Sequence, residues 1–196
     1  MAFDALSDVS DEALLVLYAN GDSGAARALT LRLVPRMLGY AARLLGDRAE
    51  AEDVAQEAML RLWRIAPDWR QDEAKVTTWL YRVVTNLSTD RLRTRQRRRL
   101  SALDDAPDVE DGTPSAEAGM IEADRMLALN AALAHLPDRQ REAVVLRHIE
   151  GLTNPEIAAV MEVGVEAVES LTARGKRALA AILSGRREEL GYEEGN

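Results

Sequence analysis

The feature that most constrains this chain is an acidic stretch interrupted by proline and glycine. Residues 101–119 carry six acidic side chains and no basic one, interrupted by Pro107, Gly112, Pro114 and Gly119. Proline and glycine end regular elements, and unpaired like charges repel one another. We expect a flexible acidic linker here. It divides the 196 residues into an N-terminal domain (1–100), a C-terminal domain (120–184) and a tail (185–196).

Both domains show the apolar pattern of helices and no pattern of strands. Apolar residues recur every ~3.6 residues, and Ala, Leu, Glu and Arg, which favour helices, dominate the composition. Ser10, Asp22 and Asp47 are suitable N-caps. We expect Pro35 to kink or split the helix that contains it. The fold class is therefore all-α, with helices at about 11–20, 23–45, 48–66 and 77–100, and a C-terminal four-helix domain at about 121–135, 138–149, 154–162 and 165–183.

Composition excludes several kinds of site. The chain has no cysteine, so disulfides and thiolate zinc sites are absent, and its two histidines are too few for a typical metal cluster. We expect no metal, no cofactor and no enzyme activity, because no nucleophilic triad or phosphate-binding glycine loop is present. The N-terminus lacks a signal-peptide pattern, and no apolar run reaches the roughly 20 residues of a membrane helix, which predicts a cytoplasmic protein without membrane insertion.

The net charge of −8 does not exclude binding to nucleic acid, because the charge is unevenly distributed. Residues 1–100 carry 16 basic and 14 acidic side chains, whereas the excess of acid lies in the linker, the C-terminal domain and the tail. Seven arginines and a single acid, Asp90, lie between Tyr81 and Leu100. Arginines this dense on one helix repel one another unless an anion faces them, and DNA phosphate is a suitable anion. Trp79 and Tyr81 precede them and could stack on bases, although core packing is the commoner role for residues such as Trp79 and Leu80.

Residues 152–179 predict a helix-turn-helix. Thr153 with Glu156 can form a capping box, or Asn154 can cap with Pro155 behind it. Two short helices follow, joined by a tight turn at residues 162–164. Val165, Val168, Leu171 and Leu179 are expected on the inner face of the second helix. Its outer face could contact phosphates and base edges through Glu166, Glu169, Ser170, Arg174, Lys176 and Arg177. A plain helical hairpin with a solvated face is the alternative.

The helix at 48–66 has an inner apolar stripe and a mixed outer surface. Leu60 and Trp63 lie three residues apart beside charged side chains, and Met59 is placed with them on the outer surface. Such a face suits a protein partner, although an ordinary amphipathic helix has the same pattern.

Three motifs in this order resemble the extracytoplasmic-function sigma factors of the sigma-70 family. They are AARLLGDRAEAEDVAQEAMLRLWR, then TWLYRVVTNLSTDRLRTRQRRR, and, after the linker, LAHLPDRQREAVVLRHIEGLTNPEIAAVMEVGVEAVESLTARGKRAL. The resemblance covers about residues 11–183. It implies a factor that binds core RNA polymerase, recognises promoter DNA and promotes strand opening, in a stress response controlled by an anti-sigma factor.

The resemblance also implies roles for particular residues. The polymerase partners would be the clamp helices and the flap, with the clamp helices contacted by Asp53, Gln56, Glu57, Leu60, Arg61, Trp63 and Arg64. The stretch 77–99 would read and melt the minus-ten element, and the loop 68–76 would capture a flipped base. Minus-ten contacts would come from Trp69, Arg70, Trp79, Arg82, Asn86, Arg91, Arg93, Arg95, Arg97 and Arg98. Minus-thirty-five contacts would come from Thr153, Asn154, Glu166, Glu169, Ser170, Arg174, Lys176 and Arg177.

The second helix of the helix-turn-helix departs from the family pattern at two places. Gly164 stands where many members have Ser or Thr, which weakens the N-cap, and Val168 is followed by Glu169 and Ser170 in place of basic residues. Two other functions compete with the sigma factor. A stand-alone helix-turn-helix regulator would bind an operator as a dimer without polymerase, and a helical adaptor would bind only proteins but would leave the arginine-rich helix unexplained.

Overall fold

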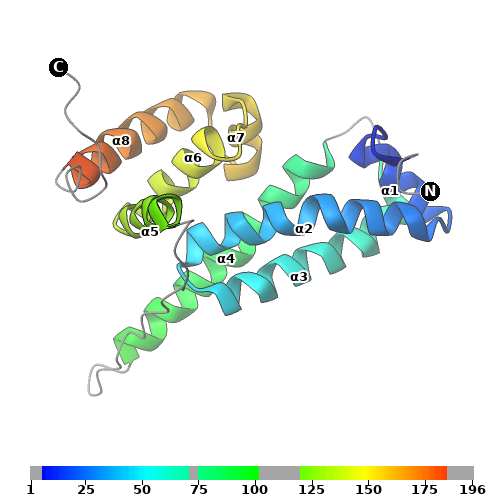
Figure 1. The fold of residues 1–196 in the computed structure, drawn as a ribbon, viewed down its shortest axis with the longest axis horizontal. Coiled ribbons are helices and arrows are strands. Elements are labelled where there is room, and N and C mark those ends of the chain that lie inside the picture. Colours follow the sequence, from blue (N-terminus) through cyan, green and yellow to red (C-terminus); the bar gives the residue numbers. More distant parts are fainter. Residues whose placement is uncertain (1–5, 71–74, 102–119, 185–196) are drawn as a thin grey trace.

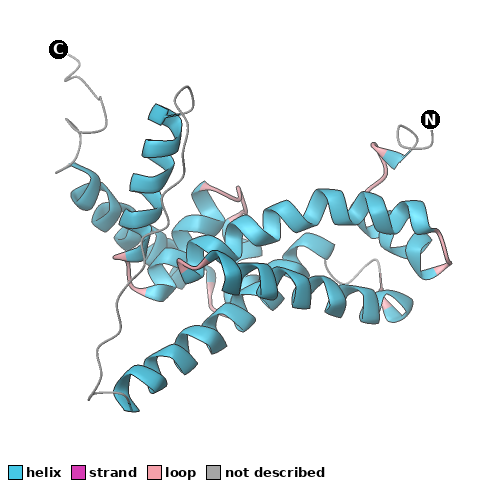
Figure 2. Cartoon of the chain, turned by 60° about the horizontal axis from the view of Figure 1, so that its bottom comes forward, coloured by secondary structure: helices cyan, strands magenta, loops and turns pink. Residues whose placement is uncertain are grey.

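The computed structural model describes residues 6–70, 75–101 and 120–184, and every regular element in these ranges is a helix (Figures 1 and 2). The expected all-α fold is confirmed. Most of the linker, the tail and residues 71–74 of the predicted base-capturing loop lie outside the described residues. The helices are α1 (Asp11–Ala19), α2 (Ser23–Leu45), α3 (Arg48–Ile65), the short 3₁₀ helix η2 (Ala66–Asp68), α4 (Val76–Ser101), α5 (Met120–Ala134), α6 (Asp138–His148), α7 (Asn154–Met161) and α8 (Val165–Ser184).

The three predicted N-caps form. Ser10 Oγ accepts a hydrogen bond from the N–H of Ala13, and the Asp22 and Asp47 carboxylates accept from backbone N–H groups of the turns that follow them. Each cap satisfies a donor that the first helical turn would leave unpaired. At the other end of α2, Gly46 takes the left-handed conformation with φ 66°, which ends the helix.

The proline in α2 does not split the helix. Pro35 lies inside one continuous helix from Ser23 to Leu45, so of the two expected effects, a kink or a split, the split does not occur. Proline removes one backbone hydrogen bond from the ladder. Leu33 and Met37, on either side of it, are fully buried, and their packing keeps the backbone helical across the gap.

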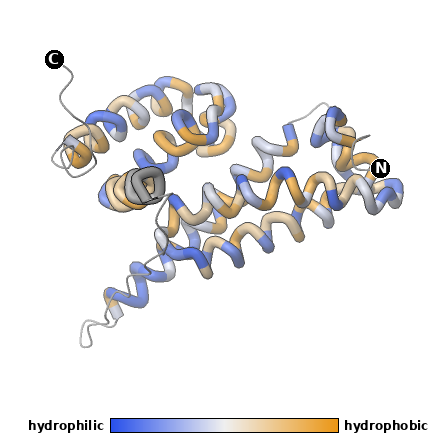
Figure 3. Tube along the Cα trace, in the orientation of Figure 1, coloured by the Kyte–Doolittle hydropathy of each residue, from blue (hydrophilic) through white to orange (hydrophobic). Residues whose placement is uncertain are grey.

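Helices α2, α3 and α4 lie side by side and enclose the N-terminal core (Figure 1). Tyr40 of α2 is fully buried between them, where its hydroxyl bonds to the Thr85 hydroxyl at 2.7 Å and its ring meets Tyr81 edge-on at 5.1 Å. The C-terminal end of α4 extends beyond its neighbours and is strongly hydrophilic (Figure 3). Within the described ranges, no helix is both long and apolar enough to cross a membrane.

The C-terminal helices α5–α8 do not stand apart from α1–α4. Helix α7 packs against α4, and α5 and α6 pack against α2 (Figure 1). The buried apolar residues of both helix groups form one continuous cluster. Glu142 of α6 lies within this contact and is almost fully buried, and burial raises the pKa of its carboxyl group.

Candidate functional site

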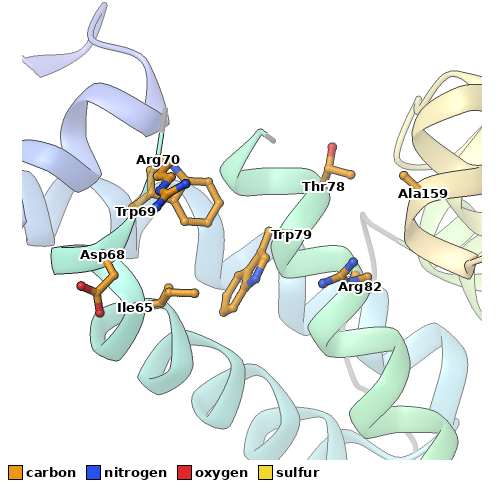
Figure 4. A pocket seen from close by; sticks show the side chains of 8 residues that line it. All are labelled: Ile65, Asp68, Trp69, Arg70, Thr78, Trp79, Arg82 and Ala159. Atoms are coloured by element: carbon orange, nitrogen blue, oxygen red, sulfur yellow. The ribbon is translucent and has the colours of Figure 1, made fainter. Parts of the chain in front are cut away.

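A pocket of about 440 Å³ lies where η2 approaches the start of α4 (Figure 4). The indoles of Trp69 and Trp79 meet edge-on at 6.1 Å between ring centroids. The other residues that line the pocket are Ile65, Asp68, Arg70, Thr78, Arg82 and Ala159. Four of the residues predicted to contact the minus-ten element thus come together here, namely Trp69, Arg70, Trp79 and Arg82. Flat rings beside guanidinium groups suit an unstacked base and its phosphate.

One polar atom of this pocket's lining has no partner. Trp69 Nε1 is buried and makes no hydrogen bond within the described part of the chain. An indole N–H can only donate, so this buried donor is left without an acceptor by the packing of the described residues. Ala159 belongs to α7, so the wall of the pocket is built by both helix groups (Figure 4).

One face of α4 continues from the pocket. Trp79, Arg82 and Asn86 follow one another at helical spacing, and Arg82 and Asn86 are exposed. Tyr81 points the other way: it is fully buried, so the expectation that it could stack on bases was wrong. Its place one residue before Arg82 puts it on the core side of the helix, where Tyr40 covers it.

The arginines at the end of α4 fall into two groups. Arg91 donates to the Glu50 carbonyl at 2.7 Å, and Arg95 donates to the Leu45 carbonyl and pairs with the Glu50 carboxylate at 2.8 Å. These two side chains brace α4 against the start of α3. The others are exposed on the projecting end of the helix, namely Arg93, Arg97, Arg98 and Arg99. The exposed group is the one available to an external anion.

An apolar groove of about 330 Å³ lies between α2 and α3. Leu60, 42% exposed, and Trp63, whose ring packs on Tyr18 at 4.6 Å, form one side of it. The remaining lining residues are Val34, Leu38, Glu52, Ala55, Gln56 and Met59. Three of the residues predicted to bind polymerase therefore line the groove, namely Gln56, Leu60 and Trp63.

The other predicted polymerase contacts lie on the exposed side of α3. Glu57 and Arg61 pair with each other at 2.9 Å, and Asp53 lies 3.6 Å from Arg91. Arg64 is exposed. The placing of Met59 on the outer surface was wrong, because it is only 5% exposed and forms part of the groove wall.

Two groove residues were missed. Val34 and Leu38 of α2 line the groove, and Leu31, one turn earlier on the same helix, is 56% exposed. Their spacing of three and four residues was a signal for a second apolar face on α2. The longer inner stripe of α2 masks that face in the sequence.

The predicted helix-turn-helix consists of α7 and α8. Glu156 accepts hydrogen bonds from the backbone N–H of Thr153 at 2.8 Å and from its hydroxyl at 2.7 Å, so the capping box forms rather than an Asn154 cap. The left-handed residue of the turn is Glu162, with φ 54°, and Gly164 is not in that conformation.

The outer face of α8 is exposed as predicted. Every residue expected there is exposed, namely Glu166, Glu169, Ser170, Arg174, Lys176 and Arg177. Asn154 of α7 reaches this face and lies 3.4 Å from Glu169. Val165 was expected inside but is 41% exposed, because it starts the helix before α8 reaches α6. The first buried position of α8 is Val168.

Comparison with known proteins agrees with this geometry. Residues 29–98 match the family description Sigma-70 region 2, and residues 126–179 match Sigma-70, region 4. The RNA polymerase sigma-H factor of Pseudomonas aeruginosa is 32% identical, over 91% of this chain and 96% of its own. The ECF RNA polymerase sigma factor SigM of Mycobacterium tuberculosis is 34% identical, over 93% of this chain and 89% of its own.

Solved structures have the same fold. The structure of CnrH in complex with the cytosolic domain of CnrY matches with a TM-score of 0.64 and 28% identity, over 89% of this chain and 97% of that one. The sigma factor RpoE of Bartonella quintana, in complex with the anti-sigma factor NepR, matches with a TM-score of 0.69 and 19% identity, over 81% of this chain and 96% of that one. The motifs, the helical architecture and the relatives lead to one conclusion: this chain belongs to the extracytoplasmic-function sigma factors, within the sigma-70 family.

Proposed function

We propose that this chain binds core RNA polymerase, recognises a promoter and promotes strand opening. Residues 1–100 would bind the polymerase clamp helices and the minus-ten element, 101–119 would link the domains, and 120–184 would read the minus-thirty-five element near the flap. The single observation that carries the proposal is the Trp69–Trp79 pocket at the start of the arginine-rich helix, in a chain of this family.

Strand opening is an energetic problem that this surface can address. Separating DNA strands loses about 1.4 kcal/mol of stacking per base-pair step. A base held in the pocket against the indole of Trp69 or Trp79, with its strand following Arg82 and Asn86, would recover part of that loss. The exposed arginines at the end of α4 would hold the adjoining phosphates, which adds affinity without sequence preference.

The apolar groove between α2 and α3 is the proposed contact for the polymerase clamp helices. It joins exposed leucine and tryptophan side chains with a rim of charged residues, the composition of a protein interface. An incoming helix with apolar side chains at helical spacing would fill such a groove.

The outer face of α8 is the proposed reader of the minus-thirty-five element. Arg174, Lys176 and Arg177 can contact phosphates or guanine, and Glu169 can accept from a cytosine amino group. Two outward glutamates weaken binding by this helix alone, which favours a factor that depends on polymerase to hold it at the promoter.

An anti-sigma factor is the proposed regulator, in a stress response. The support is that CnrH was solved with the cytosolic domain of CnrY, and RpoE with an anti-sigma factor. A partner of that kind would have to contact the surfaces that bind polymerase or DNA.

Run-off transcription with core polymerase on genomic fragments tests the proposed function. We expect specific transcripts only when both core and this chain are present, and loss of open complexes in the Asn86→Ala and Trp79→Ala variants. Asn86 is exposed, so its variant separates DNA contact from folding. Sequence-specific footprints from the chain alone, without core, would favour the stand-alone regulator and overturn the proposal.

A further inference from the structure

Glu150, in the turn between α6 and α7, inserts its carboxylate among residues of the N-terminal helices. The side chain is only 8% exposed. The Tyr81 hydroxyl donates a hydrogen bond to Glu150 Oε2 at 2.5 Å, and the Arg43 guanidinium lies 3.6 Å from Oε1. Arg36 donates to the same Tyr81 hydroxyl at 3.1 Å. These four residues are called the Glu150 cluster below.

The side-chain partners of Glu150 in the described chain lie on α2 and α4, so its burial depends on the packing of the two helix groups. A buried carboxylate is tolerated when cations and hydroxyl donors replace its water. Arg43 is not fully satisfied by this arrangement, because its buried Nε has no hydrogen-bond partner among the described residues. The site on α2 and α4 therefore has the donors of an anion site, and Glu150 supplies the anion.

Further contacts hold the same two helix groups together around the cluster. Lys75 pairs with Glu156 at 2.7 Å, and Arg82 lies 3.8 Å from Glu162. Both acidic partners belong to the ends of α7. These pairs are more exposed than the Glu150 cluster. Solvent therefore screens their charges, and each pair adds little to the stability of the contact between the helix groups.

The closed packing brings α7 to the edge of the surface that the proposed function assigns to DNA. Ala159 of α7 forms one wall of the Trp69–Trp79 pocket (Figure 4), and Glu162 lies over Arg82. A strand of DNA along Arg82 and Asn86 would meet α7 and its carboxylates. Arg82 and Asn86 stay exposed in this packing, so closure should weaken DNA binding at this face, because Ala159 and Glu162 stand beside the path of the strand.

We propose that Glu150 substitutes for a DNA phosphate: it occupies a cationic site made by Arg36, Arg43 and Tyr81, and thereby holds α7 against one side of the Trp69–Trp79 pocket until a phosphate of single-stranded promoter DNA takes its place. The proposal rests on the proposed function for its ligand, promoter DNA. Both anions accept hydrogen bonds from hydroxyl and guanidinium donors. The free chain would bind DNA weakly, and the open state would remove α7 from the side of the pocket and expose the cationic site.

The distance between the two helix groups tests the closed state without DNA or polymerase. Because the chain has no cysteine, spin labels can be placed at the exposed positions Thr30 on α2 and Ala180 on α8 through cysteine substitutions. We expect one narrow distance distribution in the unmodified background and a longer, broader one in Glu150→Gln and Arg43→Gln. Tyr81→Phe, which removes only the hydroxyl, should give an intermediate shift.

Arg48 and Glu52 provide matched controls, because they form an exposed pair within α3 at 3.1 Å. Glu52→Gln and Arg48→Gln make the same charge changes as the two test variants and should leave the distances unchanged. Circular dichroism confirms that every variant keeps its helices. A broad distribution in the free unmodified chain would overturn the closed state, and unchanged distances in both Glu150→Gln and Tyr81→Phe would overturn the role of Glu150 in holding it.

The affinity for a 20-mer of mixed-sequence single-stranded DNA distinguishes two possibilities. The site on α2 and α4 either binds a DNA phosphate or only holds the two helix groups together. Glu150→Gln should bind about tenfold more tightly than Glu52→Gln, because more of the chain is open. Arg43→Gln opens the chain as well but removes part of the cationic site, so its affinity should stay within about threefold of Arg48→Gln. An equal gain in Arg43→Gln and Glu150→Gln would show that the site does not bind phosphate. Neither measurement uses polymerase, so failure of run-off transcription alone would count against the proposed function and not against closure.

Discussion

Gly175 of α8 lies directly against Val144 of α6. A Cβ built on Gly175 would stand 2.6 Å from Val144 Cγ2 and 3.1 Å from the carbonyl oxygen of Gln140. Real side chains do not approach so closely, so the helix-turn-helix relies on a residue without a side chain at this position. Gly164, before the same helix, has open space within 4 Å of the point that a Cβ would occupy, and its φ is not left-handed.

The Gly175→Ala variant should therefore destabilise the C-terminal helices. Overpacking a tight contact costs about 1–3 kcal/mol, and the better helix propensity of alanine returns about 1 kcal/mol at most. We expect a net loss of about 1 kcal/mol in denaturant unfolding followed by circular dichroism. Gly164→Ala serves as the control: a Cβ there meets open space, so its only expected cost is that of replacing an N-cap glycine, about 0.5 kcal/mol. Equal effects of the two substitutions would contradict the close contact.

The carboxyl group of Glu156 should titrate far below an ordinary glutamate. The hydrogen bond from Lys75, followed by those from the backbone and hydroxyl of Thr153, lowers its pKa from 4.5 to about 2. A lowered pKa in the folded state means that Glu156 stabilises the fold above pH 4.5, and that this contribution is lost as the pH falls toward about 2.

Carboxyl chemical shifts in an NMR pH titration check this assignment. In Lys75→Met the pKa of Glu156 should rise but stay below 4.5, because the Thr153 donors remain. Lys176→Met removes the same charge elsewhere and should leave the pKa of Glu156 unchanged. If Lys75→Met has no effect on it, the ion pair between Lys75 and Glu156 does not form in solution.

Substitutions in the two groups of arginines on α4 should have different effects: one group should affect stability and the other the salt dependence of DNA binding. Arg95→Gln removes contacts to Leu45 and Glu50 and should lower stability by about 1 kcal/mol, a modest value because the side chain is one-third exposed. Arg97→Gln and Arg98→Gln should leave thermal unfolding unchanged. Combined with Arg93→Gln, these two should reduce the slope of log affinity against log salt for open-complex formation. A slope that stays the same would count against phosphate contacts at the end of α4.

The groove between α2 and α3 predicts a variant that blocks polymerase binding without unfolding the chain. Leu60→Arg places a charge at the mouth of the groove, and because Leu60 is 42% exposed the fold should tolerate it. We expect at least a tenfold loss of affinity for core polymerase in a pull-down titration, as for an apolar anchor at an interface. Met126, equally exposed on α5, provides the matched control: Met126→Arg should bind core polymerase normally. Equal affinity of both variants for core polymerase would show that the groove is not part of the polymerase interface.

The sequence alone determined the helices and their limits to within a few residues. Ser10, Asp22 and Gly46 act locally, through hydrogen bonds to backbone groups within one turn, so their effect can be read along the chain. The repeat of apolar residues along the chain also predicted most of the core faces of α2 and α3, because the period of a helix is a local property of the sequence. The roles of the predicted polymerase and DNA contacts, and the domain limits, stay predictions.

Only the tertiary structure decided which side chains meet. Trp69 and Trp79 become neighbours because η2 folds toward α4, Arg95 turns inward while Arg97 does not, and Glu150 reaches Tyr81 across the chain. Each of these facts depends on the packing of helices that are distant in sequence. Periodicity reports which face of a helix is apolar, but the partner of that face is set by the summed packing and desolvation of every helix around it.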